Sequence, residues 1–309
     1  MAANMQIHQA VQAPGLAPAA RPAPVRHGKF QWFVRKLFRE KRLGAAGFMI
    51  TAVFLCCGLF ADALAPYGMN AVDMGARLQA PSWAHPFGTD NLGRDLLSRC
   101  IYGAQISVVI GLMVAAISTC LSALIGIVSG YFGGKVDMLV QRFVDAWMSF
   151  PGLIVLIVVA SVFGSGITQI ITTLGLLIGI GGSRIVRSAV VSVREDMYIH
   201  AARSIGASPL RILWRHVLPN VLAPLIVLFT SSVGTAILAE SGLSFLGLGV
   251  PPPHPTWGGM LSGNGRTYML QGPWLALAPG LCLTLAVYAI NVFGDALRDM
   301  LDPRMRGAR

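Results

Sequence analysis

Long stretches without a charged side chain limit the possible folds of this chain more than any other feature. A helix needs about 20 apolar residues to cross a bilayer, and each of five uncharged stretches is about that long or longer. They are Leu43–Ala61, Ile101–Gly134, Ala146–Ser183, His216–Ala239 and Thr267–Gly294. Because 54% of the residues are hydrophobic and only 12% are charged, we interpret the chain as an all-α integral membrane protein.

The third stretch is too long for a single span. Gly164-Ser165-Gly166 interrupts it, which favours two helices joined by a tight turn. The sequence therefore predicts six transmembrane helices, at 44–64, 105–130, 146–164, 168–186, 220–240 and 273–295.

The basic residues indicate how these helices are oriented. An even number of spans puts both termini on one side of the membrane, and Lys and Arg concentrate on the cytoplasmic side. The side that carries the termini has 20 of the 24 basic residues; the others are Arg77, Arg94, Arg99 and Arg266. This predicts cytoplasmic N- and C-termini, and it explains the net charge of +11 without binding of nucleic acid.

The segments outside the spans differ in composition. Residues 1–28 are rich in Ala, Pro and Gln and predict a disordered cytoplasmic tail. Basic and aromatic residues at 29–43 indicate an amphipathic helix lying at the inner membrane interface. The other predicted parts are an external loop at 65–104, a five-helix core at 105–300 with a cytoplasmic loop at 190–220, and a cytoplasmic tail at 301–309.

The first span resembles a secretory signal at one point. Ala61-Asp62-Ala63 has the small residues of a cleavage site, but about 40 residues precede the apolar stretch, far more than a signal peptide has. We therefore expect the first span to remain in the mature protein.

The charged segment between the fourth and fifth spans carries most of the functional information. Asp196 can cap a short helix and Gly206 can end it, while Ser208 and Pro209 can begin a second one. In the second helix Leu210, Leu213, Trp214 and Val217 share one face, and Pro219 is expected to stop it. Ala201 and Ala202 leave little side-chain bulk beside Gly206, so the segment predicts a surface that docks into a partner protein and has no chemistry of its own.

This segment resembles the cytoplasmic loop of the inner-membrane permease subunits of ATP-binding cassette importers. That loop has Glu-Ala-Ala, three residues, Gly, nine residues and an apolar-x-Leu-Pro ending; Ala201-Ala202, Gly206 and Leu218-Pro219 match it, whereas His200 and His216 depart from it. The resemblance implies that the docking residues are His200, Ala201, Ala202, Arg203, Gly206, Ala207, Leu218 and Pro219.

The resemblance also implies an architecture and a set of partners. The expected fold is the type I importer permease fold, called MetI-like. The expected partners are a second, homologous permease subunit, two ATPase subunits and a periplasmic substrate-binding protein, in the bacterial inner membrane. ATP and Mg²⁺ would be bound by the ATPases, with no cofactor in this chain.

The external loop carries a second motif, at residues 88–95. Asp90 with Arg94, and Asp95 with Arg99, are spaced i,i+4 and predict a short surface helix leading into the second span. The spacing of the carboxylates does not fit a calcium loop. Gly-Thr-Asp-x-x-Gly-Arg-Asp resembles the dipeptide, oligopeptide and nickel branch of these permeases, which implies a role at the periplasmic mouth or in contact with the binding protein for Gly88, Thr89, Asp90, Gly93, Arg94 and Asp95.

Glu240 is the remaining candidate. It interrupts an apolar stretch, and a charge at membrane depth is expensive. It either faces the translocation path, where it would read a peptide's amino terminus, or lies at the outer interface where the fifth span ends.

The sequence offers little support for other functions. No lysine follows Gly175, Gly179, Gly181 and Gly182 in the P-loop pattern, so these glycines indicate close helix packing rather than ATP binding. A self-contained secondary transporter would need coupling residues near the middle of its spans, and an enzyme would need a cluster of acids, bases or metal ligands. We therefore expect a non-catalytic permease subunit that imports dipeptides or short oligopeptides, with nickel or another small solute as the alternative cargo.

Overall fold

The computed structural model describes residues 36–301. The predicted tail at 1–28, residues 29–35 of the predicted interfacial helix and residues 302–309 of the predicted C-terminal tail lie outside this part of the chain. Within it the regular structure is helical, and the only β pairing is a single bridge between Thr89 and Asp95. Residues 36–40 are helical, and Lys41 separates them from the next helix.

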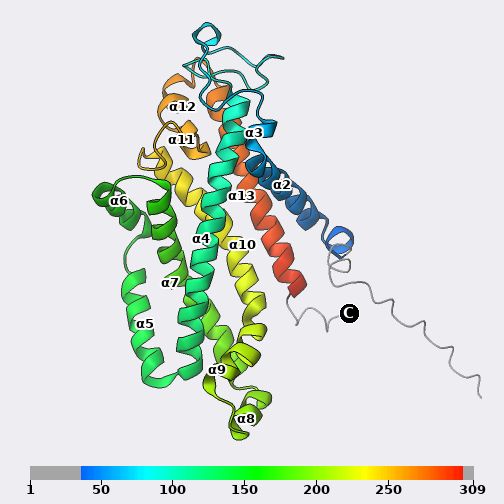
Figure 1. Ribbon diagram of the computed structural model, residues 1–309, viewed down its shortest axis with the longest axis vertical. Helices are drawn as coiled ribbons and strands as arrows, with labels where there is room; N and C mark the ends of the chain where they lie inside the picture. The colour runs from blue at the N-terminus through cyan, green and yellow to red at the C-terminus, as the bar shows by residue number, and fades with distance from the viewer. Residues whose placement is uncertain (1–35, 302–309) are drawn as a thin grey trace, which may run out of the picture. The chain divides into compact units, whose positions relative to one another are not determined.

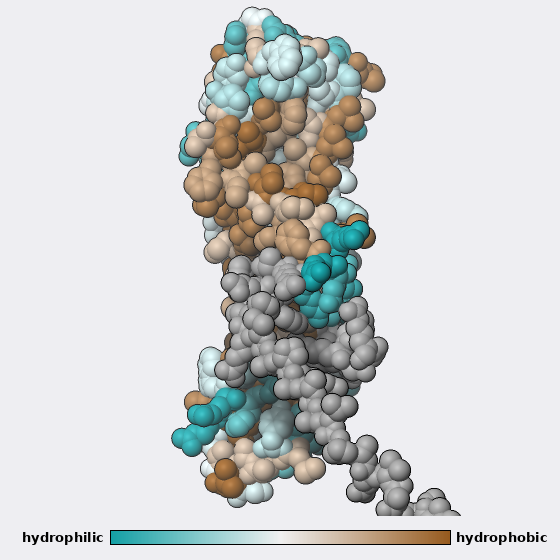
Figure 2. Space-filling model, turned by 90° about the vertical axis from the view of Figure 1, so that its right-hand side faces the viewer, coloured by the Kyte–Doolittle hydropathy of each residue, from teal (hydrophilic) through white to brown (hydrophobic). Residues whose placement is uncertain are grey.

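Five helices in the described part are long and apolar enough to cross a membrane. They are α2 (Arg42–Leu59), α4 (Leu96–Phe132), α7 (Ile167–Arg194), α10 (Leu218–Phe245), which continues a helical run that starts at Pro209, and α13 (Trp274–Leu301). On the face shown in Figure 2, apolar side chains form a band next to the polar loop end. Apolar side chains are exposed on these helices, for example at Val53, Leu124 and Leu281, and lipid can cover them.

The predicted span at 146–164 differs from the structure. Two helices occupy its place, α5 (Gly134–Met148) and α6 (Gly152–Phe163), and they are bent by 76° at a short break. Pro151 sits at this break and cannot donate a backbone N–H. The pair counts as a sixth span only if the bent helices are taken together, while the predicted turn at 164–166 does lie between α6 and α7.

Two other predicted boundaries need correction. Helix α4 begins at Leu96, so residues 96–104 of the predicted external loop are already part of a long helix. The predicted first span is broken at Phe60, after which α3 (Ala61–Leu64) continues for one turn.

Small residues let the two most extensively packed helices, α4 and α7, approach closely. A side chain at Gly126 would lie 2.6 Å from the Ser183 carbonyl oxygen, and one at Gly179 would lie 3.0 Å from the backbone of Ser118. The Ser122 hydroxyl donates a hydrogen bond to the Gly179 carbonyl oxygen across this interface (2.7 Å). The interpretation of these glycines as a helix-packing surface is therefore confirmed at Gly179.

The two segments with predicted functions lie at opposite ends of the long helices (Figure 1). One end holds α8 (Met197–Ser204), α9 (Pro209–Ile212) and the π-helix η2 (Leu213–Val217). The other end holds residues 65–95 with the short 3₁₀ helix η1 (Met74–Ala76), together with α11 (Trp257–Leu261) and α12 (Gly263–Tyr268). Below, residues 196–217 are called the docking element and residues 65–95 the outer loop.

Candidate functional site

The bend in the docking element comes from Gly206. Its φ is +79°, a left-handed conformation that glycine adopts without strain. The Gly206 N–H donates to the Arg203 carbonyl oxygen and the Ala207 N–H donates to the Ala202 carbonyl oxygen, both at 3.0 Å. This closes the end of α8 in the way that glycine commonly ends a helix.

The second helix begins as the sequence predicts but does not end there. Ser208 is the N-cap, and its hydroxyl accepts a hydrogen bond from the Arg211 N–H. The expectation that Pro219 stops the helix is wrong, because α9 passes through the π-helix η2 directly into α10. The Asn220 side-chain amide donates to the His216 carbonyl oxygen (2.6 Å), which satisfies one backbone acceptor in this irregular stretch.

The buried face of the docking element differs from the predicted one. Of the four predicted apolar positions only Val217 is buried, whereas the side chains of Leu210 and Trp214 are each 67% exposed. Ile199, Ala202, Ile212 and Val217 instead form a core with Val186 and Val190 of α7 and Tyr131 of α4. Ala202 is therefore part of the core rather than of the bare surface that the sequence suggested.

The other predicted docking residues divide by exposure. His200, Ala201, Arg203, Gly206 and Pro219 are exposed, while Ala207 and Leu218 are half-buried. The Arg203 guanidinium lies over the Tyr131 ring, 5.1 Å from its centroid. Exposed apolar residues surround them at Met197, Ile205, Leu210 and Trp214, so the element presents an apolar surface that nothing in the described chain covers.

The outer loop brings its predicted residues together in a tight turn and not in the short helix that their spacing suggested. Gly88 and Gly93 have φ values of +76° and +72°, and a side chain at Gly93 would lie 1.6 Å from the Asp73 carbonyl oxygen. Thr89 is fully buried; its backbone carbonyl accepts a hydrogen bond from the Trp274 indole (3.1 Å), which ties the turn to α13.

The two predicted ion pairs have different outcomes. Arg94 pairs with Asp90 at 2.7 Å, as expected. Asp95 does not pair with Arg99; its carboxylate contacts His85 Nδ1 (2.9 Å) and caps α4 by accepting from the Ser98 N–H (2.7 Å). The pairing of Asp95 with Arg99 was wrong because residue 95 is the N-cap of α4, so its side chain turns back toward the helix start.

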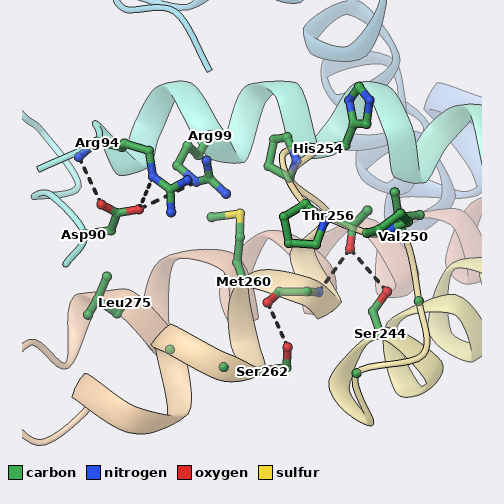
Figure 3. Close-up of a pocket in the computed structure, with 18 of the residues that line it drawn as sticks. Asp90, Arg94, Arg99, Ser244, Val250, His254, Thr256, Met260, Ser262 and Leu275 are labelled. Atoms are coloured by element: carbon green, nitrogen blue, oxygen red, sulfur yellow. Dashed lines mark hydrogen bonds and ion pairs between the residues drawn. The ribbon is translucent and has the colours of Figure 1, made fainter. Parts of the chain in front are cut away.

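A cavity of about 380 Å³ lies between the outer loop, the end of α10 and helices α11 and α12, and we call it the outer cavity. Figure 3 shows Asp90, Arg94 and Arg99 gathered at one part of its wall, and Ser244 and Thr256 at another. Its size is in the range of small-molecule sites. Asp90 and Arg94 are predicted mouth residues that line the cavity. Arg99, His254, Thr256 and Met260 also line it, and they are not among the predicted mouth residues.

Glu240 is fully buried, in the C-terminal part of α10. Its carboxyl group accepts a hydrogen bond from the Ser244 hydroxyl (2.6 Å), and the Thr256 hydroxyl donates in turn to Ser244 (3.4 Å). Ser244 and Thr256 line the outer cavity, and Glu240 is not among its lining residues. Among residues 36–301, no three His, Cys, Asp or Glu side chains gather to hold a metal ion.

Apolar helices long enough to span a membrane, an uncovered apolar surface at one end and a cavity lined by charged residues at the other indicate a multi-span membrane protein of the transport class. Residues 122–307 match the family described as "Binding-protein-dependent transport system inner membrane component". The chain belongs to this family and is a permease subunit of an ABC importer.

Curated relatives match along most of the chain. It is 43% identical over 276 residues to "Putative peptide transport system permease protein" of Brucella suis biovar 1 (strain 1330), covering 88% of this chain and 91% of the relative. It is 38% identical over 272 residues to "Dipeptide transport system permease protein DppC" of Alkalihalophilus pseudofirmus (strain ATCC BAA-2126 / JCM 17055 / OF4), covering 88% and 89%. The resemblance to the peptide-permease branch is thereby confirmed.

A solved structure supports the fold. A chain of the MetNI methionine ABC transporter, in inward-facing conformation, superposes with a TM-score of 0.53 at 19% identity, covering 67% of this chain and 98% of that chain. The MetI-like permease fold expected from the docking motif is confirmed.

Proposed function

We propose that this chain is the translocation subunit of an ATP-driven, binding-protein-dependent importer that moves dipeptides or short oligopeptides across the bacterial inner membrane by alternating access. The observation that carries this proposal is the 43% identity to a putative peptide transport permease over 88% of the chain. The relative named as a dipeptide permease supports the same cargo class.

The uncovered apolar surface of the docking element supports an ATPase partner. Met197 and Ile205 are 89% and 85% exposed, at the end of the molecule that the distribution of basic residues assigns to the cytoplasm. A groove on one ATPase subunit would cover this surface. A groove on a second ATPase subunit would cover the equivalent surface of a second, homologous permease. ATP and Mg²⁺ would be bound by the ATPases, and this chain would be non-catalytic.

The outer loop supports a second contact, with a periplasmic binding protein. It is held rigid by the buried Thr89 and by the pairs of Asp90 and Asp95. Trp83 on this loop is fully exposed, at 104%, and exposed aromatic residues are common anchors in protein interfaces. A delivering protein would release its cargo beside the outer cavity.

Uptake by cells tests the proposed function. Cells that lack only this gene are compared with the same cells carrying it on a plasmid, for uptake of a labelled dipeptide and of nickel. We expect dipeptide uptake to fall at least tenfold and to return with the gene, while nickel uptake stays unchanged. A fall in nickel uptake alone would move the cargo to nickel, and no change in either would contradict the proposed cargo.

Replacement of His200 by the family's glutamate is expected to be tolerated. The His200 side chain is exposed in the first turns of α8, where a carboxylate is favourable toward the helix N-terminus by about 0.3–1 kcal/mol. We expect His200→Glu to retain dipeptide uptake within about twofold of the original, at equal abundance in membranes. An inactive variant that still assembles with the ATPase would instead assign His200 a specific partner.

A further inference from the structure

The positive and negative charges of the side chains that line the outer cavity are unequal in number. Arg94 and Arg99 carry two positive charges and Asp90 carries one negative charge, and the rest of the lining is neutral apart from the titratable His254. Asp95 is close in sequence, but it is not among the lining residues and is engaged by His85 and Ser98. The cavity wall therefore has one positive charge in excess.

Asp90 is already fully engaged. Its Oδ1 atom accepts hydrogen bonds from the Leu92 N–H (2.8 Å) and the Arg94 N–H (3.0 Å), and its Oδ2 atom accepts from Arg94 Nε (2.7 Å). Because the Asp90 carboxylate pairs closely with Arg94, it neutralises the charge of Arg94. The carboxylate then has little capacity to bind a second guanidinium.

Arg99 is the group that remains undercompensated. It is only 8% exposed, and its Nε atom is 3.9 Å from Asp90 Oδ2, beyond hydrogen-bonding distance. Its Nη1 atom donates to the Met69 carbonyl oxygen (3.0 Å). This acceptor carries no formal charge, and Figure 3 shows the Arg99 guanidinium beside Arg94 on the cavity wall.

The nearest counter-charge of the buried Arg99 is thus 3.9 Å away and already pairs with Arg94, and a buried charge that is incompletely compensated is costly. A guanidinium is shaped to bind a carboxylate through two parallel hydrogen bonds. We propose that the outer cavity is a carboxylate-binding subsite in which Arg99 receives the terminal carboxylate of the transported solute. This inference rests on the proposed function for the identity of the solute, a short peptide. The remaining wall, with Val250, Met260 and Leu275, suits its neutral part.

Binding of a dipeptide and of its amide to the full-length chain in lipid nanodiscs tests the subsite. Alanyl-alanine and alanyl-alanine amide share the amino group and side chains, and they differ only in the carboxylate. Binding is measured by ligand-observed NMR titration at millimolar concentrations, without a binding protein. We expect alanyl-alanine to bind at least fivefold more tightly than the amide, and acetate to compete with it.

Two variants and one control assign that preference to a residue. We expect Arg99→Gln to weaken binding of alanyl-alanine at least fivefold, to the level of the amide, and to leave binding of the amide unchanged. Arg99→Lys keeps the charge but loses the paired donors, so an intermediate affinity is expected. The control is Arg266→Gln, which removes an exposed arginine on the same side that does not line the cavity and is expected to bind as the original.

Each outcome decides the subsite. Equal binding of the acid and the amide by the original chain would overturn it without any variant, and so would an unchanged preference in Arg99→Gln or Arg99→Lys. If Arg99→Gln fails to insert, the Arg99→Lys titration decides alone. The two proposals can also fail separately. If the chain binds the acid selectively through Arg99 but deletion of its gene leaves dipeptide uptake intact, the subsite is supported and the proposed function is overturned. If deletion abolishes dipeptide uptake but the chain shows no preference for the acid, the proposed function is supported and the subsite is overturned.

Discussion

Replacement of Gly206 by glutamate is expected to reduce dipeptide uptake at least tenfold while leaving the chain inserted in the membrane. Gly206 has a φ of +79°, and left-handed backbone costs a residue with a side chain about 1–2 kcal/mol. No atom lies within 4 Å of the position of a Cβ at Gly206, so the new side chain would project outward. It would place bulk and a negative charge on the surface that we propose docks into the ATPase.

The variant Gly206→Asn separates backbone strain from obstruction. Asparagine adopts the left-handed conformation more readily than other residues with a side chain, and it adds no charge. We expect it to retain most of the uptake. The measurements are uptake, abundance in the membrane fraction, and recovery of the ATPase with the affinity-tagged chain; normal uptake by Gly206→Glu at normal abundance would contradict the docking role.

The local features of the docking element could be predicted because short-range chemistry determines them. The N-cap at Ser208 and the left-handed Gly206 depend on neighbouring backbone groups alone. The end of the second helix could not be predicted in this way. Pro219 lies inside the continuous helical run Pro209–Phe245. The π-helix at Leu213–Val217, directly before it, carries the chain into α10, so Pro219 does not act as a stop.

The choice of buried face also depended on information outside the segment. Leu210 and Trp214 have the spacing of a core-facing stripe, yet they are exposed. Ile212 is buried instead because Val186 and Val190 of α7 lie against it. An apolar stripe on a short helix shows that it has an apolar face, but a partner protein can cover that face as well as the chain's own core.

The outer cavity shows the same division between local and distant contacts. The pair of Asp90 with Arg94 is four residues apart and followed from sequence spacing. Arg99 was paired with the wrong carboxylate, because Asp95 caps α4 and the Arg99 guanidinium instead contacts the Met69 carbonyl oxygen, which is distant in the sequence, and Asp90. Five of the six spans could be predicted from hydropathy, whereas the remaining one is the bent pair of α5 and α6. Its 76° bend occurs inside an apolar run that has no charge to mark it.

Replacement of Trp257 by alanine is expected to destabilise the protein by about 3–5 kcal/mol, the usual cost of removing a large buried aromatic side chain. Trp257 is fully buried, and its indole N–H donates to the Cys100 carbonyl oxygen of α4 (3.0 Å). Its ring meets the edge of Phe54 of α2, with centroids 5.3 Å apart. A side chain at Gly103 would lie 3.1 Å from the indole, so at this point the ring packs against the bare backbone of α4.

The control for this substitution is Trp83→Ala, because Trp83 is fully exposed on the outer loop and its removal leaves no internal space. We expect the thermal unfolding temperature in detergent to fall for Trp257→Ala and to stay unchanged for Trp83→Ala, while Trp257→Phe falls less because it keeps most of the buried ring. The Trp257→Ala chain should also be less abundant in membranes. An unchanged unfolding temperature would contradict the role of Trp257 in holding α11 against α4.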